Sequence, residues 1–242
     1  MRILIISDLH ANITALEAVL AEAGPVDACW CLGDLVGYGP DPNECIARVR
    51  SLPNLTCIIG NHDAAVLKQI DVDTFNPEAR LAIIWTQKVL SDDNVAFLRL
   101  LPEKLEVGQV TLAHGSPRHP VWEYLLDTRT ATLNFGYFGS PYGFVGHTHL
   151  PVIYSLTNGQ NIAGMSIPVP NTRLVLSPRV ILNPGSVGQP RDRDPRASFA
   201  IFDPDTNVWE YRRVAYDIRQ VQERMLSAGL PERHIQRLSG GW

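Results

Sequence analysis

Seven side chains with oxygen or nitrogen donors stand just after short apolar runs of the chain. They are Asp8, His10, Asp34, Asn61, His114, His147 and His149. One Asp-x-His stretch alone also fits a turn that caps the next helix, whereas Gly146–His149 places two imidazoles in one tight turn, which has little structural purpose. The joint occurrence of these clusters, which use Asp, His and Asn but no Cys, predicts a metal centre.

The number of donors points to two ions. Seven donors exceed what one ion takes from a protein that must also leave room for a substrate. Two ions roughly 3.5–4 Å apart that share one carboxylate would use them all. Such a pair activates a bridging water and holds a phosphoryl group during in-line displacement. Two divalent transition-metal ions are therefore expected, and mixed carboxylate and imidazole ligands suit Mn, Fe, Zn, Ni or Co without choosing among them.

The elements that must position these donors are short strands. Expected strands precede the donor clusters at Ile3–Ile6, Ala28–Leu32, Leu55–Ile59, Val110–Ala113 and Gly143–Gly146. In a sheet covered by helices, ligands bind beyond the carboxyl ends of the strands. Donors from distant parts of the chain would therefore meet at one place.

Helical patterns alternate with the strands of the first half, which argues for a sheet with helices packed on it. Helix starts are expected at Thr14, Asp41, Asn76 and Ser91, with Thr14 and Glu17 as a capping box.

The second half is rich in short β runs, separated by turn signals such as Asn158-Gly159 and Asp203-Pro204. We expect these runs to form a largely antiparallel meander in a second sheet. A helix from about Ile218 to Leu226, one or two turns over Leu230–Leu238 and a frayed C-terminal tail should follow.

Composition limits the class of protein. The 242 residues are 45% hydrophobic with a formal net charge of -4, which is typical of a globular chain with a sizeable core. No linker signal divides the chain, so we expect a single domain over residues 1–242. No global positive field attracts nucleic acid or an anionic membrane, so neither partner is expected.

The compartment follows from two further observations. No apolar run approaches the roughly 20 residues of a membrane span, and the start lacks a signal-peptide pattern. Four cysteines are present and are expected to be reduced core residues of a cytoplasmic protein: Cys29, Cys31, Cys45 and Cys57.

Five motifs together resemble, in the same order, the signature of calcineurin-like metallophosphoesterases. They are Asp8-Leu9-His10, Gly33-Asp34, Gly60-Asn61-His62-Asp63, His114-Gly115 and Gly146-His147-Thr148-His149. Asn183–Pro190 is also similar to the small bacterial phosphodiesterase branch of that family. The resemblance implies an α/β fold, a four-layer α/β/β/α sandwich of two mixed sheets flanked by helices.

The same resemblance implies a role for each donor. Asp8, His10 and His149 would hold one metal, Asn61, His114 and His147 the other, and Asp34 would bridge both. His62 matches a histidine that binds no metal, contacts the phosphate and can protonate the leaving oxygen. Asp63 would help to orient His62, although another carboxylate could do so. Asn12 is expected to be a helix N-cap before it is a substrate contact.

One departure from the pattern bears on the substrate. Protein phosphatases and symmetrical dinucleotide-tetraphosphate hydrolases of the superfamily carry an arginine soon after the second-motif aspartate, whereas Leu35–Pro40 contains none. Arg118, Arg191 and Arg193 could serve instead, although solvated surface charge explains them equally well. His119 and His234 are expected to be exposed rather than ligands.

The expected function is a two-metal-dependent phosphodiesterase that uses a metal-bridging hydroxide as its nucleophile. Its partner would be a small phosphoester or nucleotide substrate, and nothing predicts its oligomeric state. The alternatives are a phosphomonoesterase or nucleotide phosphatase, and a non-catalytic metal-binding scaffold. An intact donor set with His62 present speaks against the scaffold, which has no need of a leaving-group acid.

Overall fold

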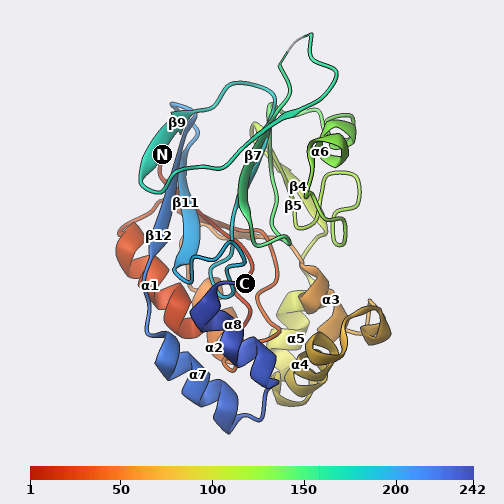
Figure 1. Cartoon of the computed structure of the whole chain (residues 1–242), viewed down its shortest axis with the longest axis vertical. Helices are drawn as coiled ribbons and strands as arrows, with labels where there is room; N and C mark the ends of the chain where they lie inside the picture. The colour runs from red at the N-terminus through yellow and green to blue at the C-terminus, as the bar shows by residue number, and fades with distance from the viewer. Residues whose placement is uncertain (158) are drawn as a thin grey trace.

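Two mixed six-stranded sheets lie face to face between helices in the computed structural model, which describes residues 1–157 and 159–242 (Figure 1). The strand order is β3-β2-β1-β11-β12-β9 in the first sheet and β4-β5-β6-β10-β7-β8 in the second. This arrangement confirms the predicted α/β/β/α sandwich. Asn158, which belongs to an expected turn signal, lies outside the described residues.

The first sheet combines strands from both ends of the chain. Its members are β1 (Ile3–Ile6), β2 (Ala28–Cys31), β3 (Thr56–Cys57), β9 (Thr172–Val175), β11 (Ala197–Asp203) and β12 (Val208–Val214). β1, β2 and β3 run parallel, so their carboxyl ends meet at one edge. The loops that follow them carry the first three donor clusters.

The second sheet is built from the middle of the chain. Its members are β4 (Lys104–Val107), β5 (Val110–Ala113), β6 (Tyr142–Phe144), β7 (Pro151–Ser155), β8 (Gly164–Ser166) and β10 (Val180–Pro184). β5 and β6 are parallel, and the other two donor clusters follow them. Both sheets therefore deliver donors from the carboxyl ends of neighbouring parallel strands.

The helices form the outer layers and one end of the molecule (Figure 1). They are α1 (Ile13–Ala23), α2 (Pro42–Arg50), α3 (Asn61–Val66), α4 (Pro77–Val89), α5 (Asp92–Arg99), α6 (Thr128–Asn134), α7 (Ile218–Ser227) and α8 (Glu232–Gly240), with a short 3-10 turn η1 (Val72–Thr74). In the part of the chain that the structure describes, no helix is long and apolar enough to cross a membrane.

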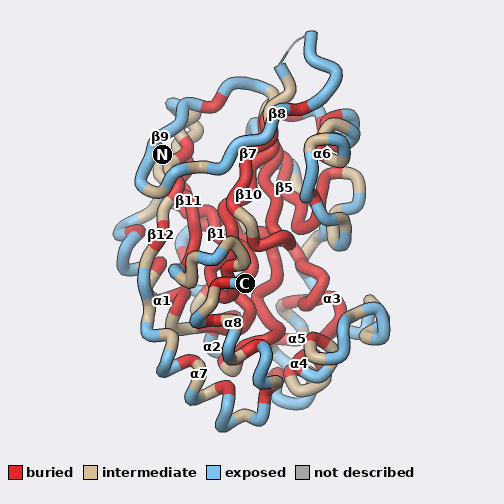
Figure 2. Tube along the Cα trace, viewed as in Figure 1, coloured by how far each residue is buried: buried red, intermediate tan, exposed pale blue. Residues whose placement is uncertain are grey.

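Alternate residues of β1 bury into two different apolar layers. Leu4 and Ile6 pack with α1 and α2, whereas Ile3 and Ile5 pack between the sheets. Figure 2 shows the resulting pattern, with buried strands inside and partly exposed helices outside. All four cysteines are buried and form no disulfide, as predicted.

The expected second sheet exists, but three strands that were assigned to it, β9, β11 and β12, instead complete the first sheet. β11 pairs antiparallel with β1, and Ile3 lies opposite Phe202. β11 is buried on both faces, with Phe199 in the helix-side layer and Phe202 between the sheets. Such a strand belongs inside a sheet rather than in a half-exposed meander.

Two local expectations also need correction. The first helix begins at Ile13 with Asn12 as its N-cap, whose side chain accepts a hydrogen bond from the Ala15 amide, so Thr14 is not the cap. The C-terminal tail packs onto the protein rather than projecting away, because Gly241 is buried and its carbonyl accepts a bond from the Arg193 amide at 2.6 Å.

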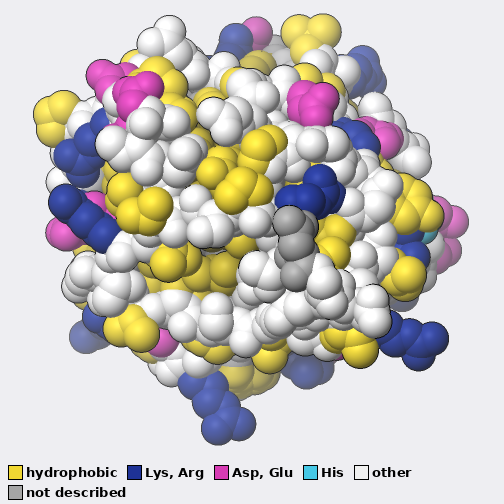
Figure 3. Space-filling view, turned by 90° about the horizontal axis from the view of Figure 1, so that it is seen from above, with side chains coloured by type: hydrophobic (Ala, Val, Ile, Leu, Met, Phe, Trp, Pro, Cys, Tyr) yellow, Lys and Arg dark blue, Asp and Glu magenta, His cyan; other side chains and the backbone are white. Residues whose placement is uncertain are grey.

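The end of the molecule that carries β8 has several exposed apolar side chains, among them Ile162 and Ile167. Figure 3 looks onto this end and shows apolar side chains gathered on the surface. β8 lies there, and Met165 within it is 53% exposed. None of the predicted donors belongs to this strand or to the segment that follows it.

Candidate metal centre

All seven predicted donors lie just beyond the carboxyl ends of strands, six of them in loops and Asn61 at the start of α3, and each is at most 2% exposed. Asp8 and His10 follow β1, Asp34 follows β2, and Asn61 begins α3 just after β3. His114 follows β5 directly. The loop after β6 brings His147 and His149 to the same place, so both sheets contribute to one buried cluster.

The backbone at this cluster is strained. Five of the seven donor residues have positive φ angles between 47° and 66°, a region that costs residues with a side chain roughly 1–2 kcal/mol each. These residues are Asp8, His10, Asp34, His147 and His149. Gly60 permits part of this close packing, since a Cβ there would lie 2.1 Å from Oδ1 of Asp34.

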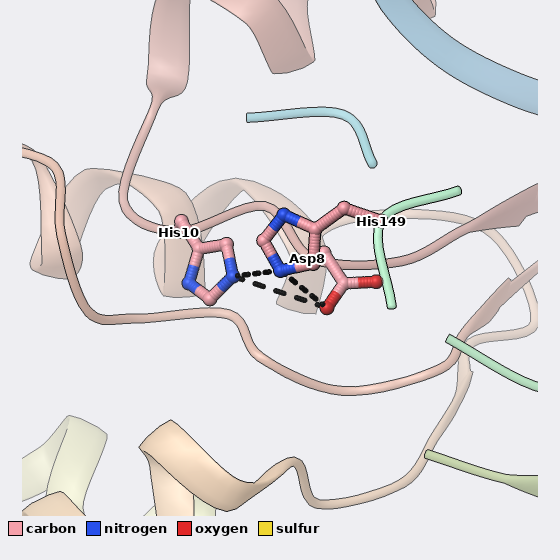
Figure 4. Close-up of side chains that lie close together, drawn as sticks. All are labelled: Asp8, His10 and His149. Atoms are coloured by element: carbon pink, nitrogen blue, oxygen red, sulfur yellow. Dashed lines mark hydrogen bonds and ion pairs between the residues drawn. The ribbon is translucent and has the colours of Figure 1, made fainter. Parts of the chain in front are cut away.

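One group of donors consists of Asp8, His10 and His149, whose candidate ligand atoms lie within 4.8 Å of one another (Figure 4). The two Nε2 atoms of His10 and His149 are 3.0 Å apart, and Nε2 of His149 is 3.3 Å from Oδ1 of Asp8. Lone-pair donors that converge this closely suit a cation placed among them.

The second group contains Asp34, His114 and His147, which meet the same distance limit. Asn61 joins it, because its Oδ1 lies 3.1 Å from Nε2 of His114. Nε2 of His147 is buried and has no hydrogen-bond partner among the described residues. A buried nitrogen without a partner is a position where a metal ion would restore an interaction.

Asp34 stands between the two groups. Its Oδ2 lies 3.4 Å from Nε2 of His114 and 3.6 Å from Nε2 of His10. Its other oxygen accepts a hydrogen bond from the backbone amide of His62 at 2.9 Å. One carboxylate thus faces both groups while the backbone fixes its orientation.

Backbone carbonyls orient three of the imidazoles. Nδ1 contacts the carbonyl oxygen of Val36 in His10, of Leu32 in His114 and of Gln189 in His149. An N–H at Nδ1 leaves the lone pair of Nε2 directed into the cluster, which is the tautomer that binds metal.

The buried carboxylates of the cluster would be stabilised by a cation. Burial raises the pKa of Asp8 to about 6. Burial also raises the pKa of Asp34, but the charges of His114, His62 and His10 and the hydrogen bond with His114 together outweigh burial and hold the pKa below its usual range. Burial lowers the pKa of both His10 and His149, so these imidazoles are neutral. Among the described residues, the ion-pair partners of the two carboxylates are histidines, and the donor set fits two divalent cations.

His62 lies beside the cluster without joining either group. Its ring packs against the rings of His10 at 4.9 Å, Tyr38 at 4.4 Å and Phe75 at 5.1 Å between centroids. Its Nδ1 is buried and unpartnered within the described chain. One ring nitrogen of His62 also lies within 4.8 Å of ligand atoms of His10 and Asp34, so His62 can reach a group bound at the centre.

Asp63 holds two loops together. Its carboxylate accepts hydrogen bonds from the backbone amides of Val36 at 3.1 Å and Gly60 at 3.0 Å. No hydrogen bond to His62 occurs among the described residues. The carboxylate therefore reaches His62 only through the backbone that it fixes.

Several residues that line the site were not singled out from the sequence. Tyr124 packs on His147 with ring centroids 3.8 Å apart, and Trp122 packs on Phe75 at 4.9 Å. Tyr38 packs on His10 at 4.6 Å. The position of Tyr38 between Gly37 and Gly39, directly after a donor loop, is a signal that could have identified it.

The candidate arginines differ in their surroundings. Arg118 is engaged by Glu123 through a 3.1 Å hydrogen bond and an ion pair. Arg193 is exposed. Arg191 reaches toward the centre and lies 5.7 Å from the ring centroid of Tyr38. His119 is exposed as expected, but the expectation for His234 is wrong, because α8 turns this histidine inward and leaves it 1% exposed.

Comparisons with known proteins identify relatives of this chain. A family model for the calcineurin-like phosphoesterase superfamily domain matches residues 1–207. A metallophosphoesterase from Sphaerobacter thermophilus is 49% identical, and its crystal structure gives a TM-score of 0.91 over 100% of this chain and 99% of that chain. An uncharacterized protein of Methanocaldococcus jannaschii is 39% identical over 238 residues, 95% of this chain and 94% of that protein. A symmetrical bis(5'-nucleosyl)-tetraphosphatase of Pectobacterium atrosepticum is 31% identical over 127 residues, which span 49% of this chain and 44% of that enzyme.

Proposed function

Because the chain belongs to the calcineurin-like phosphoesterase superfamily, whose members are metal-dependent phosphoester hydrolases, we propose that it hydrolyses phosphodiesters with two divalent metal ions. The observation that carries the proposal is the position of Asp34, whose Oδ2 faces a histidine of each donor group. Asp8, His10 and His149 would hold one ion, Asn61, His114 and His147 the other, and Asp34 both. When bound, the ions would supply Lewis acidity and a hydroxide nucleophile at neutral pH.

His62 supplies the acid in this proposal. Its Nδ1 is enclosed against Gly37, which leaves Nε2 as the nitrogen that delivers a proton to the leaving oxygen. A diester has a poor alkoxide leaving group, so it gains most from such an acid. Asp63 acts as a positioning residue through the loop that carries His62.

Aromatic residues beside the donors support the proposed hydrolysis. Phe75, Trp122 and Tyr124 cover one side of the donors and limit the access of water to them.

The two sheets share one apolar layer, which supports treating residues 1–242 as a single domain. Mn is the ion that we would test first, with Fe, Zn, Ni and Co beside it.

A second candidate is hydrolysis of a dinucleoside polyphosphate. The partial match to a symmetrical bis(5'-nucleosyl)-tetraphosphatase favours it. Leu35–Pro40 contains no arginine, so any cation that holds the phosphates of such a substrate must come from another part of the chain.

The test is a comparison of bis(p-nitrophenyl) phosphate with p-nitrophenyl phosphate, which share one leaving group. With each divalent metal in turn, we expect the diester to give the higher kcat/KM. Arg118→Ala should leave this order unchanged, because Arg118 is occupied by Glu123. A monoester preference in the parent that is lost in Arg191→Ala would instead make the protein a phosphomonoesterase. Absence of turnover with every metal would favour a metal-binding scaffold.

A further inference from the structure

Two arginines near the centre share a single uncharged partner. Nη2 of Arg191 lies 3.0 Å from Oε1 of Gln189, and Nη1 of Arg237 lies 3.4 Å from the same oxygen. Neither guanidinium takes part in an ion pair among the described residues. Two cations held together without a carboxylate form a site for an anion.

Buried polar atoms around these arginines also lack partners. His234 is 1% exposed, and neither of its ring nitrogens forms a hydrogen bond with a described residue. Gln189 is 2% exposed, and its Nε2 is unpartnered in the same sense, as are the Nε atoms of Arg191 and Arg237. Buried donors are normally paired, so this concentration of free N–H groups indicates a missing acceptor.

The charges repel one another in the present arrangement. Burial lowers the pKa of Arg237, and the neighbouring charge of Arg191 lowers it further. An anion between the two side chains would remove this repulsion and accept their free N–H groups.

The cluster adjoins the metal centre through Tyr38 and Gln189. The ring of Tyr38 lies 4.4 Å from that of His62 on one side and 4.5 Å from that of His234 on the other. The Tyr38 hydroxyl is 3.3 Å from Nη2 of Arg191. The carbonyl of Gln189 contacts Nδ1 of the proposed ligand His149. An anion bound by the arginines would therefore be a near neighbour of the group at the centre.

We propose that Arg191, Arg237, Gln189 and His234 bind a second phosphate, adjacent to the one that is hydrolysed. The favoured substrate class is then a phosphodiester that carries a polyphosphate chain. The cavity beside Tyr38 and Gln189 has a volume of about 10 Å³, so the half-buried arginine side chains must open around the phosphate. This inference rests on the proposed function, because it assigns the neighbouring group of the same substrate.

The test compares two esters with one leaving group. The first is the p-nitrophenyl ester of thymidine 5'-monophosphate, and the second is the p-nitrophenyl ester on the terminal phosphate of thymidine 5'-triphosphate. In both, water adds across the bond between phosphorus and the nitrophenolate oxygen. With free Mn held constant, we expect the full-length protein to favour the triphosphate ester by about tenfold or more in kcat/KM.

Arg237→Gln tests the assignment of the cluster. We expect it to lower kcat/KM for the triphosphate ester by about 10- to 100-fold, the size of a charge-assisted hydrogen bond, and to change the monophosphate ester by less than about 3-fold. Arg233→Gln is the matched control, because Arg233 lies on the same helix but points to Glu78 at 3.6 Å. Equal losses for both esters, or an equal loss in the control, would overturn the inference.

A binding measurement separates this inference from the proposed function. Equilibrium dialysis of the two esters against the Mn-loaded His62→Ala protein should show tighter binding of the triphosphate ester, and Arg237→Gln should remove the difference. Hydrolysis of bis(p-nitrophenyl) phosphate without this difference would refute the second phosphate site and leave the phosphodiesterase proposal intact. The difference in binding without any hydrolysis would uphold the site and refute the proposed activity.

Discussion

Gly37 and His62 are packed so closely that a Cβ atom on the glycine would lie 2.4 Å from Nδ1 of the histidine. Gly37 also has a φ of +92°, which disfavours any other residue. The loop after β2 therefore sets the position of a ring that belongs to α3. His62, the proposed acid, can occupy its position only because residue 37 has no side chain.

Gly37→Ala should displace His62 and lower kcat for an aryl diester by about 10-fold or more, toward the loss caused by removing His62 itself. Metal content measured after desalting should stay at the parental level, because Gly37 carries no donor. Gly108→Ala is the control, since Gly108 also has positive φ but nothing within 4 Å of its added Cβ. A rate equal to that of the parent would show that His62 is not held by this contact.

Asp34→Asn should abolish the binding of both ions. The change keeps the shape of the side chain but removes the negative charge that both donor groups face. Metal analysis should show less than one ion per chain. Asp127→Asn should retain both ions, because Asp127 caps α6 and takes no part in the centre. Loss of only one ion from Asp34→Asn would contradict the bridging role.

His62→Ala should lower the rate by about 10²- to 10⁴-fold while leaving metal content nearly intact. The reason is that His62 is proposed to donate a proton to the leaving oxygen and to bind no metal. His119→Ala, which changes an exposed histidine, should leave kcat unchanged. If His62→Ala loses an ion instead, His62 is a ligand together with His10 and Asp34, which lie within the same 4.8 Å group.

His234 should make stability depend on pH. Burial lowers its pKa from 6.5 to about 4 in the folded protein. Below pH 6.5 the unfolded chain binds a proton that the folded chain does not, so the free energy of unfolding should fall by about 1.4 kcal/mol per pH unit until pH 4. Above pH 6.5 neither state binds it, and this dependence vanishes.

Denaturant unfolding at pH 7.5 and pH 5 measures this dependence. His234→Phe keeps an aromatic ring against Tyr38 but cannot bind a proton, so it should lose less stability between the two pH values than the parent does. Equal losses in the two proteins would show that His234 is not responsible.

The donors were the part of the site that the sequence predicted best. Each of the clusters from Asp8 to His149 combines a short apolar run with polar residues that end it. Such a pattern is local in the sequence, so it can be recognised without knowledge of the tertiary structure. The structure brings all seven candidate donors into one buried cluster, and the family model over residues 1–207 confirms the family resemblance. The assignment of each donor to one ion or the other stays a prediction.

The lining of the site was less predictable. Arg237 and His234 lie three positions apart on α8, a helix without a motif, and the side of this helix that faces inward is set by its packing on distant residues such as Tyr38. Arg191 follows a recognisable segment, but whether an arginine is paired depends on neighbours that the chain order does not give. The prediction of which strands form each sheet failed for the same reason. The pairing of β11 with β1 joins residues about 200 positions apart, such as Ile3 and Phe202.

The spread of the donors along the chain has a consequence for how the protein folds. His10 and His149 meet across 139 positions and come from different sheets, so neither donor group exists until the sheets have docked. Contacts of such long range form late and slowly. We therefore expect metal ions to bind the folded structure rather than to nucleate folding, so added metal should slow the unfolding rate without accelerating refolding.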